Sequence, residues 1–325
     1  MESPRVYFLG SGEIAVPVLR TLVHSKKLKF IGVGTQIDRP AGRKCRLVPT
    51  PVGQAAEALG IKADKVPSVN APEYLQYLRD LEPDVILVVS FGQLLKQELL
   101  DLPACACVNI HASLLPAYRG ASPIVSAMLA KEKETGMTFM EMVKALDAGP
   151  MYTKVTRPLD GSEFAGPLEI ELGELAAEAT EDVLLKICSG ELKAVPQNEE
   201  EATFCKKIKK SDGIIDWNAD ASDIDAKVRA YTPWPGAKCT ISTEKGESTI
   251  TISRCRIRPE LTGKPGEFLS TDKKSIVVGC GNGGALEILE VIPSGGKAMP
   301  AAAFRNGLRG LPPVFLLPEN IDDNQ

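Results

Sequence analysis

The chain has 325 residues, of which 44% are hydrophobic, 25% are charged and 5% are aromatic, and its formal net charge is −4. A length of this size favours two domains. So few aromatic residues argue against an extended surface for stacking bases, and no apolar run reaches the length needed to span a membrane.

The first half of the chain alternates strand-like and helix-like segments. Apolar strands are expected at 5–9, 29–35, 85–90 and 107–111, and helices at 14–24, 71–81 and 124–130. Asn70 and Glu73 fit a capping box at the start of helix 71–81. This alternation predicts a doubly wound, mostly parallel α/β sheet of the Rossmann-like kind. Ligands of such sheets bind beyond the carboxyl ends of the strands, where Asn109, His111 and residues 90–93 would meet.

The second half changes character after a long helix expected at 167–188. The polar, acidic stretch 197–201 has the composition of a linker, and a helix is expected at 223–230. Short β-rich runs separated by Gly and Pro turns then follow at 238–242, 249–258, 267–270, 275–278 and 286–292. Five such strands suit a small antiparallel, OB-like barrel. We therefore expect a first domain over 1–204, with the linker at its end, and a smaller one over 205–325.

Charge and cysteine content bear on partners and compartment. Residues 1–205 carry 21 Lys and Arg against 27 Asp and Glu, whereas residues 206–309 carry 17 against 12. The positive second part is consistent with an anionic partner or with a chance imbalance of surface charge. The eight cysteines form no Cys-x-x-Cys pair, which favours free thiols in a reducing compartment. With no secretion signal at its start, the chain is expected to be cytoplasmic.

The run Gly10-Ser11-Gly12-Glu13-Ile14-Ala15 fits the G-x-G-x-x-A pattern of dinucleotide-binding turns, with Asp38 further along. Taken alone it would indicate an NAD-dependent oxidoreductase. Asp38, however, falls beyond the second strand, in a stretch crowded with Pro and basic residues. A tight strand-to-helix turn that needs glycine is the preferred interpretation, and such a turn could still face an anion.

Asn109 and His111 are the first candidates for chemistry. Alternation along a strand points both to the same side. The amide can donate to a developing oxyanion, and an imidazole is suited to proton transfer. The chain has only two histidines, and His24 lies at the end of an amphipathic helix, where a surface position is expected. A catalytic histidine would therefore be His111.

The segment 109–120 resembles the signature Asn-x-His-x-Ser-Leu-Leu-Pro-x-x-Arg-Gly of the folate-dependent formyltransferases. The similarity extends over almost the whole chain, through 16–19, 35–43, 90–95, 135–138 and 146–149. Segments 209–217 and 229–237 resemble the C-terminal domain of those members that act on methionyl-tRNA.

The resemblance implies a catalytic trio of Asn109, His111 and Asp147. Asn109 and His111 would stabilise a tetrahedral oxyanion, and Asp147 would orient His111 and help to carry a proton. From the residues alone, Asp147 could equally lie in a plain surface turn. The formyl donor would be 10-formyltetrahydrofolate, with no metal involved. The implied folate-binding residues are Phe91, Gly92, Gln93, Leu94, Ser113, Leu114, Leu115 and Pro116.

The resemblance further implies that the acceptor is methionine on charged initiator tRNA and that the protein is a monomer. The basic loop 38–51, which Pro and Gly should keep out of regular structure, would approach the acceptor stem, although its composition also suits a solvated loop. The implied tRNA-binding residues are Arg39, Arg43, Lys44, Arg46, Lys209 and Lys210. Formyl transfer to a small amine, hydrolysis of the formyl-folate and a non-catalytic RNA-binding module are the alternatives.

Overall fold

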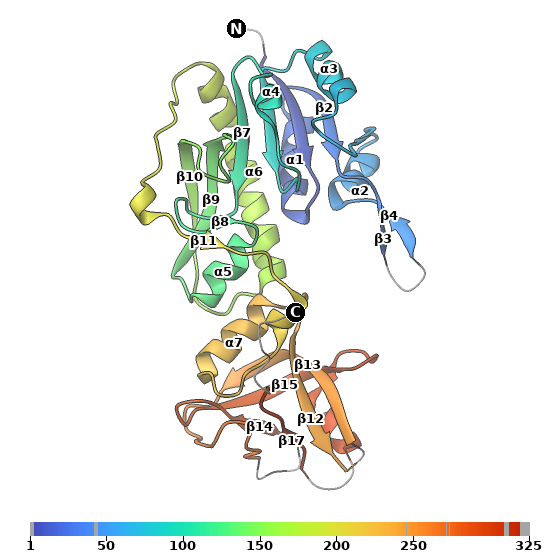
Figure 1. Cartoon of the computed structure of the whole chain (residues 1–325), viewed down its shortest axis with the longest axis vertical. Coiled ribbons are helices and arrows are strands. Elements are labelled where there is room, and N and C mark those ends of the chain that lie inside the picture. The colour runs from blue at the N-terminus through green and yellow to red at the C-terminus, as the bar shows by residue number, and fades with distance from the viewer. Residues whose placement is uncertain are drawn as a thin grey trace. The chain divides into compact units, whose positions relative to one another are not determined.

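The computed structural model describes residues 3–41, 45–244, 246–270, 272, 274–308 and 312–318 (Figure 1). The chain divides into two compact units. The first comprises residues 1–124, 134–158 and 167–206, and the second comprises residues 125–133, 159–166 and 207–325. The second unit thus includes two short segments from within the range that the sequence assigns to the first domain.

A single large sheet supports the described part of the first unit, in the order β10-β9-β7-β6-β1-β2-β5. The five strands from β5 to β7 are parallel, and β9 and β10 are antiparallel to their neighbours. This arrangement confirms the predicted doubly wound, mostly parallel sheet. The strand bounds are Arg5–Gly10 (β1), Lys29–Thr35 (β2), Asp64–Lys65 (β5), Val85–Val89 (β6), Ala106–His111 (β7), Glu134–Glu141 (β9) and Met151–Pro158 (β10).

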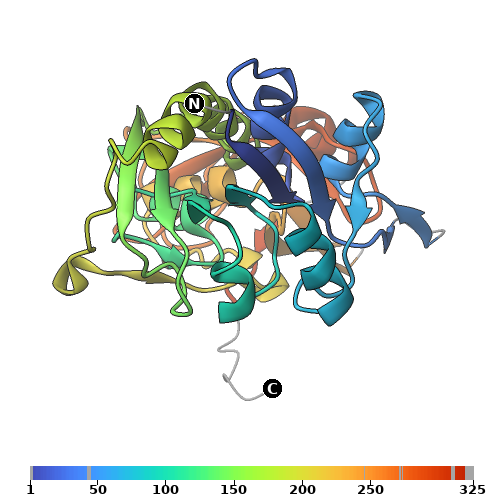
Figure 2. The ribbon, with the colours of Figure 1, turned by 90° about the horizontal axis from the view of Figure 1, so that it is seen from above.

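Helices cover both faces of this sheet, so β6 is buried along its whole length. On one face, Leu75 and Leu78 of α3 and Leu99 of α4 pack against Tyr7 and Ile86. α1 and α6 lie on the opposite face (Figure 2). The helix bounds are Val16–His24 (α1), Pro51–Ala58 (α2), Pro72–Asp80 (α3), Gln97–Leu100 (α4) and Ala165–Cys188 (α6). The helix Pro123–Leu129 (α5) belongs mostly to the second unit.

The strand order reverses between β1 and β6, which is where open α/β sheets bind ligands. There the backbone N–H groups of Ser11 and Gly12 both donate to Ser90 O, at 3.2 and 3.3 Å. The turn after β1 is therefore bonded to the turn after β6. β7, with Asn109 and His111 near its carboxyl end, is the next strand along.

The capping box predicted at Asn70 is wrong. Pro72 lies in the first turn of α3 and has no N–H to cap, and the residue at the N-cap is Ala71, which makes no side-chain cap. Asn70 instead donates to Leu94 O and accepts from Lys96 N, both at 2.8 Å. It therefore joins the start of α3 to the loop after β6.

The basic loop after β2 contains regular structure, which also differs from the prediction. Arg39–Ala41 (β3) and Arg46–Val48 (β4) pair as an antiparallel hairpin. Pro40 is compatible with this because a two-stranded ribbon leaves the outer edge of each strand unpaired. Arg43 and Lys44 lie outside the described residues.

The described part of the second unit is built on an antiparallel sheet in the order β14-β15-β13-β12-β17. Trp217 and Phe315 are fully or almost fully buried in its core and meet edge to face. The bounds are Ala221–Ala230 (α7), Ala237–Thr243 (β12), Gly246–Ile257 (β13), Ile276–Gly279 (β14), Ala285–Pro293 (β15), Met299–Pro300 (β16, paired with β15), Ala301–Gly307 (α8) and Val314–Phe315 (β17).

The segment 266–269 nearly closes this sheet into the predicted barrel. Gly266 N and Leu269 N donate to Gly279 O and Val277 O of β14, and a Cβ on Gly266 would lie 2.6 Å from Phe315 O of β17. The segment therefore lies between the two edge strands. The strand predicted at 267–270 is reduced to this bonding and to one isolated bridge at Phe268.

The acidic stretch 197–201, whose composition is that of a linker, is bonded to the first unit. It contains the short helix Glu199–Glu201 (η2) and leads into Phe204–Cys205 (β11), which pairs in parallel with Arg119–Gly120 (β8). The stretch therefore lies against the loop that follows His111.

Candidate active site

His111 and Asp147 face each other at the carboxyl end of β7. His111 Nδ1 lies 3.7 Å from Asp147 Oδ2, and the two side chains are 7% and 11% exposed. His111 Nε2 lies 2.9 Å from Tyr118 O. Because a carbonyl oxygen can only accept, Nε2 carries the hydrogen of that bond and Nδ1 is left facing the carboxylate. An imidazole nitrogen and a carboxylate that face each other in this way are suited to proton transfer.

Asn109 lies two residues before His111, between Val88 of β6 and Met140 of β9. Its side chain points to the same face of the sheet as His111 because residues alternate along a strand. Asn109 is half-buried, and its amide has no hydrogen-bond partner within the described residues. Such an amide can donate to an oxygen atom of a bound substrate.

Buried hydroxyl groups fix the loop that follows β7. Thr138 Oγ1 donates to Ser113 O at 2.6 Å and accepts from Leu115 N at 3.1 Å. Ser113 and Leu115 are 1% and 0% exposed as whole residues, so neither offers surface to a ligand and both act as supports of the loop. The same bonds hold the loop so that the Tyr118 carbonyl reaches His111.

The loop of Asp147 is fixed from three sides. Asp147 has a φ of 50°, which is strained for a residue other than glycine. Gly120 N donates to Asp147 Oδ2, and Gln197 Nε2 donates to the carbonyl oxygens of Asp147 and Gly149, all at 2.8 Å. A Cβ on Gly149 would lie 1.7 Å from Glu141 O, so only glycine fits there. The carboxylate is thus set beside His111 and is not in a freely solvated turn.

Side chains also fix the loop after β6, which the resemblance assigns to the folate. Gln93 donates to Val66 O and accepts from Val69 N, so its amide is committed to the protein backbone. The Phe91 side chain is 2% exposed and packs in the core, whereas Leu94 is 77% exposed. The exposed residues that this loop offers to a ligand are Ser90, Gly92 and Leu94.

The residues assigned to tRNA contact belong to both units. Arg39 and Arg46 are exposed on the β3–β4 hairpin, where Arg39 Nη2 bonds to Gln36 Oε1. Lys209 and Lys210 are exposed at the start of the short helix Lys210–Gly213, near the beginning of the second unit. No acidic partner is found for either lysine side chain within the described residues.

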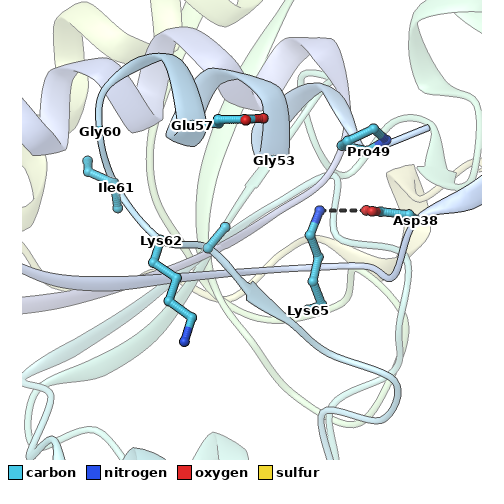
Figure 3. Close-up of a pocket in the computed structure, with 9 residues that line it drawn as sticks. Asp38, Pro49, Gly53, Glu57, Gly60, Ile61, Lys62 and Lys65 are labelled. Carbon is cyan, nitrogen blue, oxygen red and sulfur yellow. Dashed lines mark hydrogen bonds and ion pairs between the residues drawn. The ribbon is translucent and has the colours of Figure 1, made fainter. Parts of the chain in front are cut away.

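The turn Gly10–Ala15 is structural. Two of its N–H groups are used by Ser90 O, and a Cβ on Gly12 would lie 2.5 Å from Ser90 Oγ. Asp38, the acid that a dinucleotide site would need, is paired with Lys65 at 2.5 Å. The pair borders a pocket of about 440 Å³ between α2 and β5 (Figure 3), which contains none of the three candidate catalytic residues. These contacts favour the glycine-turn interpretation over an NAD site.

Two residues of the site were not predicted. Arg119 is 2% exposed, although guanidinium groups are rarely buried without partners. Arg119 lies inside the formyltransferase signature 109–120, and that position is the feature of the sequence that points to a role in the site. Gln197 is 8% exposed and lies in the acidic stretch, where its sequence context gives no sign of a role.

Metal-binding and membrane-spanning features were sought over the described ranges. No group of three or more His, Cys, Asp or Glu side chains there could hold a metal ion. No helix in the same ranges has the length and hydrophobicity to cross a membrane.

Two family models match the chain. The model described as formyl transferase matches residues 4–184, and the model described as formyl transferase, C-terminal domain, matches residues 207–309. The first covers the sheet, the loop after β7 and Asp147. The second covers most of the antiparallel unit.

Curated proteins of nearly the same length are similar to the chain. A methionyl-tRNA formyltransferase of Geobacter sulfurreducens is 40% identical over 309 residues, which is 95% of each chain. The Bacillus subtilis protein of the same name is 36% identical over 303 residues, covering 93% of this chain and 94% of that one. Among solved structures, HypX from Aquifex aeolicus in complex with tetrahydrofolic acid matches with a TM-score of 0.64 at 19% identity, over 95% of this chain and 48% of that one.

Proposed function

The chain belongs to the formyl transferase family, and from that premise we propose that it transfers the formyl group of 10-formyltetrahydrofolate to the α-amino group of methionine on charged initiator tRNA. The tetrahydrofolic acid bound by the HypX structure supports the choice of donor class. The methionyl-tRNA formyltransferases that match over nearly their whole length support the choice of acceptor. We further propose that the protein is a cytoplasmic monomer, and its eight free cysteines are consistent with a reducing compartment.

The observation that carries this function is the grouping of Asn109, His111 and Asp147 at the end of β7. The three supply an amide that has no partner among the described residues, an imidazole, and a carboxylate held 3.7 Å from that imidazole. Acyl transfer to an amine needs a donor for a developing oxyanion and a group that moves protons. The trio offers both.

In the proposed reaction the methionine amine attacks the formyl carbon and the carbonyl oxygen becomes a tetrahedral oxyanion. Asn109 Nδ2 donates to that oxyanion, a contact typically worth about 3 kcal/mol, or roughly two to three powers of ten in rate. The amine loses a proton, and N10 of the folate gains one as its bond to the formyl carbon breaks. The products are formyl-methionyl-tRNA and tetrahydrofolate.

His111 and Asp147 carry that proton. The 3.7 Å between Nδ1 and Oδ2 is too long for a hydrogen bond, so the proton passes when the pair closes around substrate or through a bridging water. Catalytic hydrogen bonds are often longer before substrate binds. Asp147 stabilises the charged imidazole, and the Tyr118 carbonyl fixes the ring orientation.

The tRNA would be bound through phosphate contacts from both units. Arg39 and Arg46 supply cations in the first unit, and Lys209 and Lys210 supply them in the second. Arg43 and Lys44, which lie outside the described residues, are proposed for the same role from the sequence alone. Side chains of this kind contact phosphates irrespective of sequence. The exposed hairpin and the exposed lysines are consistent with that role.

The function is tested with purified protein, 10-formyltetrahydrofolate and methionine-charged initiator tRNA. Formyl-methionine on the tRNA and free tetrahydrofolate are followed together in wild type, His111→Ala and His24→Ala. His24 is the matched control because it is the chain's other histidine and is exposed at the end of α1. We expect both products to form in equal amounts, to be lost in His111→Ala and to be retained in His24→Ala.

Two outcomes contradict the proposal. Tetrahydrofolate released without formylated tRNA would mean that the formyl group goes to water or to a small amine. Full activity of His111→Ala would remove the catalytic role of the trio.

A further inference from the structure

The segment 195–205 is bonded to the catalytic unit at both ends. Val195 and Met151 exchange two backbone hydrogen bonds, at 2.8 and 2.9 Å. Further along, Thr203 N donates to Pro116 O, and Arg119 N donates to Thr203 O at 2.8 Å. The middle of the segment is thereby held beside the loops that carry His111 and Asp147.

Gln197 uses every hydrogen-bonding position of its side chain in this segment. Its Nε2 donates to the carbonyl oxygens of Asp147 and Gly149, both at 2.8 Å, and its Oε1 accepts from Arg119 Nε and Nη2 at 3.0 and 2.9 Å. The orientation of the amide is determined, because guanidinium groups only donate and carbonyl oxygens only accept. A flipped amide would place its NH2 group against the N–H groups of Arg119 and its oxygen against the two carbonyl oxygens.

Arg119 is held in turn by Glu199. Its Nη1 and Nη2 donate to the two carboxylate oxygens of Glu199, both at 2.8 Å, in a bidentate pair. These hydrogen bonds raise the pKa of Arg119 and lower the pKa of Glu199. The residue after Arg119 is Gly120, whose N–H holds the carboxylate of Asp147. Gln197 therefore connects the backbone of Asp147 to β8, the strand whose Gly120 N–H positions the Asp147 carboxylate.

The hydrogen bonds from Gln197 hold the backbone of Asp147 in a conformation that is uncommon for a residue other than glycine. A φ of 50° is sparsely populated by residues other than glycine and persists only where surrounding contacts impose it. Without Gln197, two carbonyl oxygens of the Asp147 loop and two N–H groups of Arg119 would lose their partners. The loop would then relax, and Asp147 Oδ2 would move relative to His111 Nδ1.

We propose that Gln197 is a positioning residue for the reaction, acting through Arg119 and the Asp147 loop to hold the Asp147 carboxylate against His111. The expected loss of kcat rests on the proposed function. The expected displacement of Asp147 from His111 does not, because it can be measured in the protein without substrates.

The kinetic test is a double-mutant cycle between Gln197→Ala and Asp147→Asn, with Gln197→Glu as a second variant. Gln197→Glu retains the size of the side chain and an acceptor for Arg119, but it cannot donate to Asp147 O and Gly149 O. In the wild-type background we expect either change at Gln197 to lower kcat by roughly 10- to 100-fold, as misplacement of a catalytic group does. The KM for tRNA should stay within about twofold. In the Asp147→Asn background the same changes should have little further effect, because residues acting as a unit are not additive.

The matched control is Gln76→Ala on α3, an exposed glutamine that bonds to Asp80 on its own helix. Gln76→Ala should leave kcat unchanged in each background, equal to wild type in the first and to Asp147→Asn in the second. Losses from Gln197→Ala that are equal with and without Asp147 would indicate a general structural role and would overturn the inference.

The structural test uses the chain's two histidines, because selective ¹⁵N labelling then gives only two imidazole spectra. His111→Ala assigns them. At fixed pH we expect Gln197→Ala and Gln197→Glu to shift the His111 signals while those of His24 remain unchanged. The shift in Gln197→Ala should be toward the values seen in Asp147→Asn.

The two tests separate the two proposals. If wild type forms no formylated tRNA, the proposed function fails while the spectra still decide the role of Gln197. If formyl transfer is normal but both Gln197 variants leave the His111 signals unchanged, the positioning role is wrong and the function stands.

Discussion

At the scale of single residues, the side chain of Asp147 can be changed without losing its structural contact. Gly120 N bonds to Asp147 Oδ2, and the oxygen of an asparagine could accept the same bond. A neutral amide, however, cannot stabilise a protonated His111. We expect Asp147→Asn to lower kcat by about 10²–10⁴-fold, the usual range for loss of acid–base catalysis, and to leave tRNA affinity unchanged. Steady-state kinetics and a tRNA-binding assay measure both.

Asp182→Asn is the control for this change, because Asp182 is exposed on α6 and pairs with Lys186 four residues later. Its kcat should be that of wild type. An Asp147→Asn protein that loses tRNA binding in proportion to kcat would mean that the carboxylate serves substrate binding.

The contribution of Asn109 can be measured separately from that of His111 and Asp147. Asn109 stabilises the oxyanion, whereas the other two residues transfer the proton. Asn109→Ala removes a half-buried amide that has no protein partner among the described residues, so the fold loses no hydrogen bond. We expect kcat to fall by about 10²–10³-fold, with melting temperature little changed. A fall in melting temperature that matched the loss of activity would place Asn109 in the framework instead.

At the scale of elements, two glycines of α6 occupy different surroundings. A Cβ on Gly173 would lie 2.6 Å from the backbone oxygen of Ile14, whereas a Cβ on Gly166 would find only Pro233 Cδ at 3.7 Å. Gly173→Ala should therefore push α6 away from the turn after β1 and destabilise the protein by about 1–3 kcal/mol. Gly166→Ala should be neutral or stabilise by up to about 1 kcal/mol, because alanine favours helix. Urea unfolding of both variants measures the difference, and equal stabilities would show that α6 does not depend on this close approach.

The elements also show what the sequence could predict. β1, β6 and β7 are buried apolar runs between turn residues, and β2 is buried over its last three residues; the predicted bounds of all four agree with the structure within a residue or two. α2 was not predicted because Pro49-Thr50-Pro51 resembles a loop. The same residues begin the helix, with Thr50 accepting from Gly53 N as the N-cap and Pro51 following it. That signal was present in the sequence and was missed.

The candidate site was predictable only in part, for a physical reason. Asn109 and His111 share one strand, so alternation alone places them together. Asp147 lies in a loop after another strand, and only the resemblance indicated it. Gln197 is brought to that loop by long-range hydrogen bonds that join the segment 195–205 to Pro116 and Arg119, and neither periodicity nor composition reveals such bonds.

At the scale of the whole molecule, the two parts of the sequence carry charges of opposite sign. Residues 1–205 have a net charge of −6 from 21 cations and 27 anions, and residues 206–309 have +5 from 17 and 12. If the positive part contacts tRNA phosphates, binding must weaken as salt competes for them.

The KM for tRNA should therefore rise steeply with ionic strength while the KM for the formyl donor changes little. For about four phosphate contacts, a fourfold rise in monovalent salt should weaken tRNA binding by roughly 10²-fold. Replacing Lys209 and Lys210 together by alanine should reduce the slope of log KM against log salt by about 1–2. Lys186→Ala on α6, where the lysine already pairs with Asp182, is the matched control and should leave the slope unchanged. An unchanged slope in the double variant would show that these lysines do not contact phosphates, and a flat dependence in wild type would point to a small, uncharged acceptor.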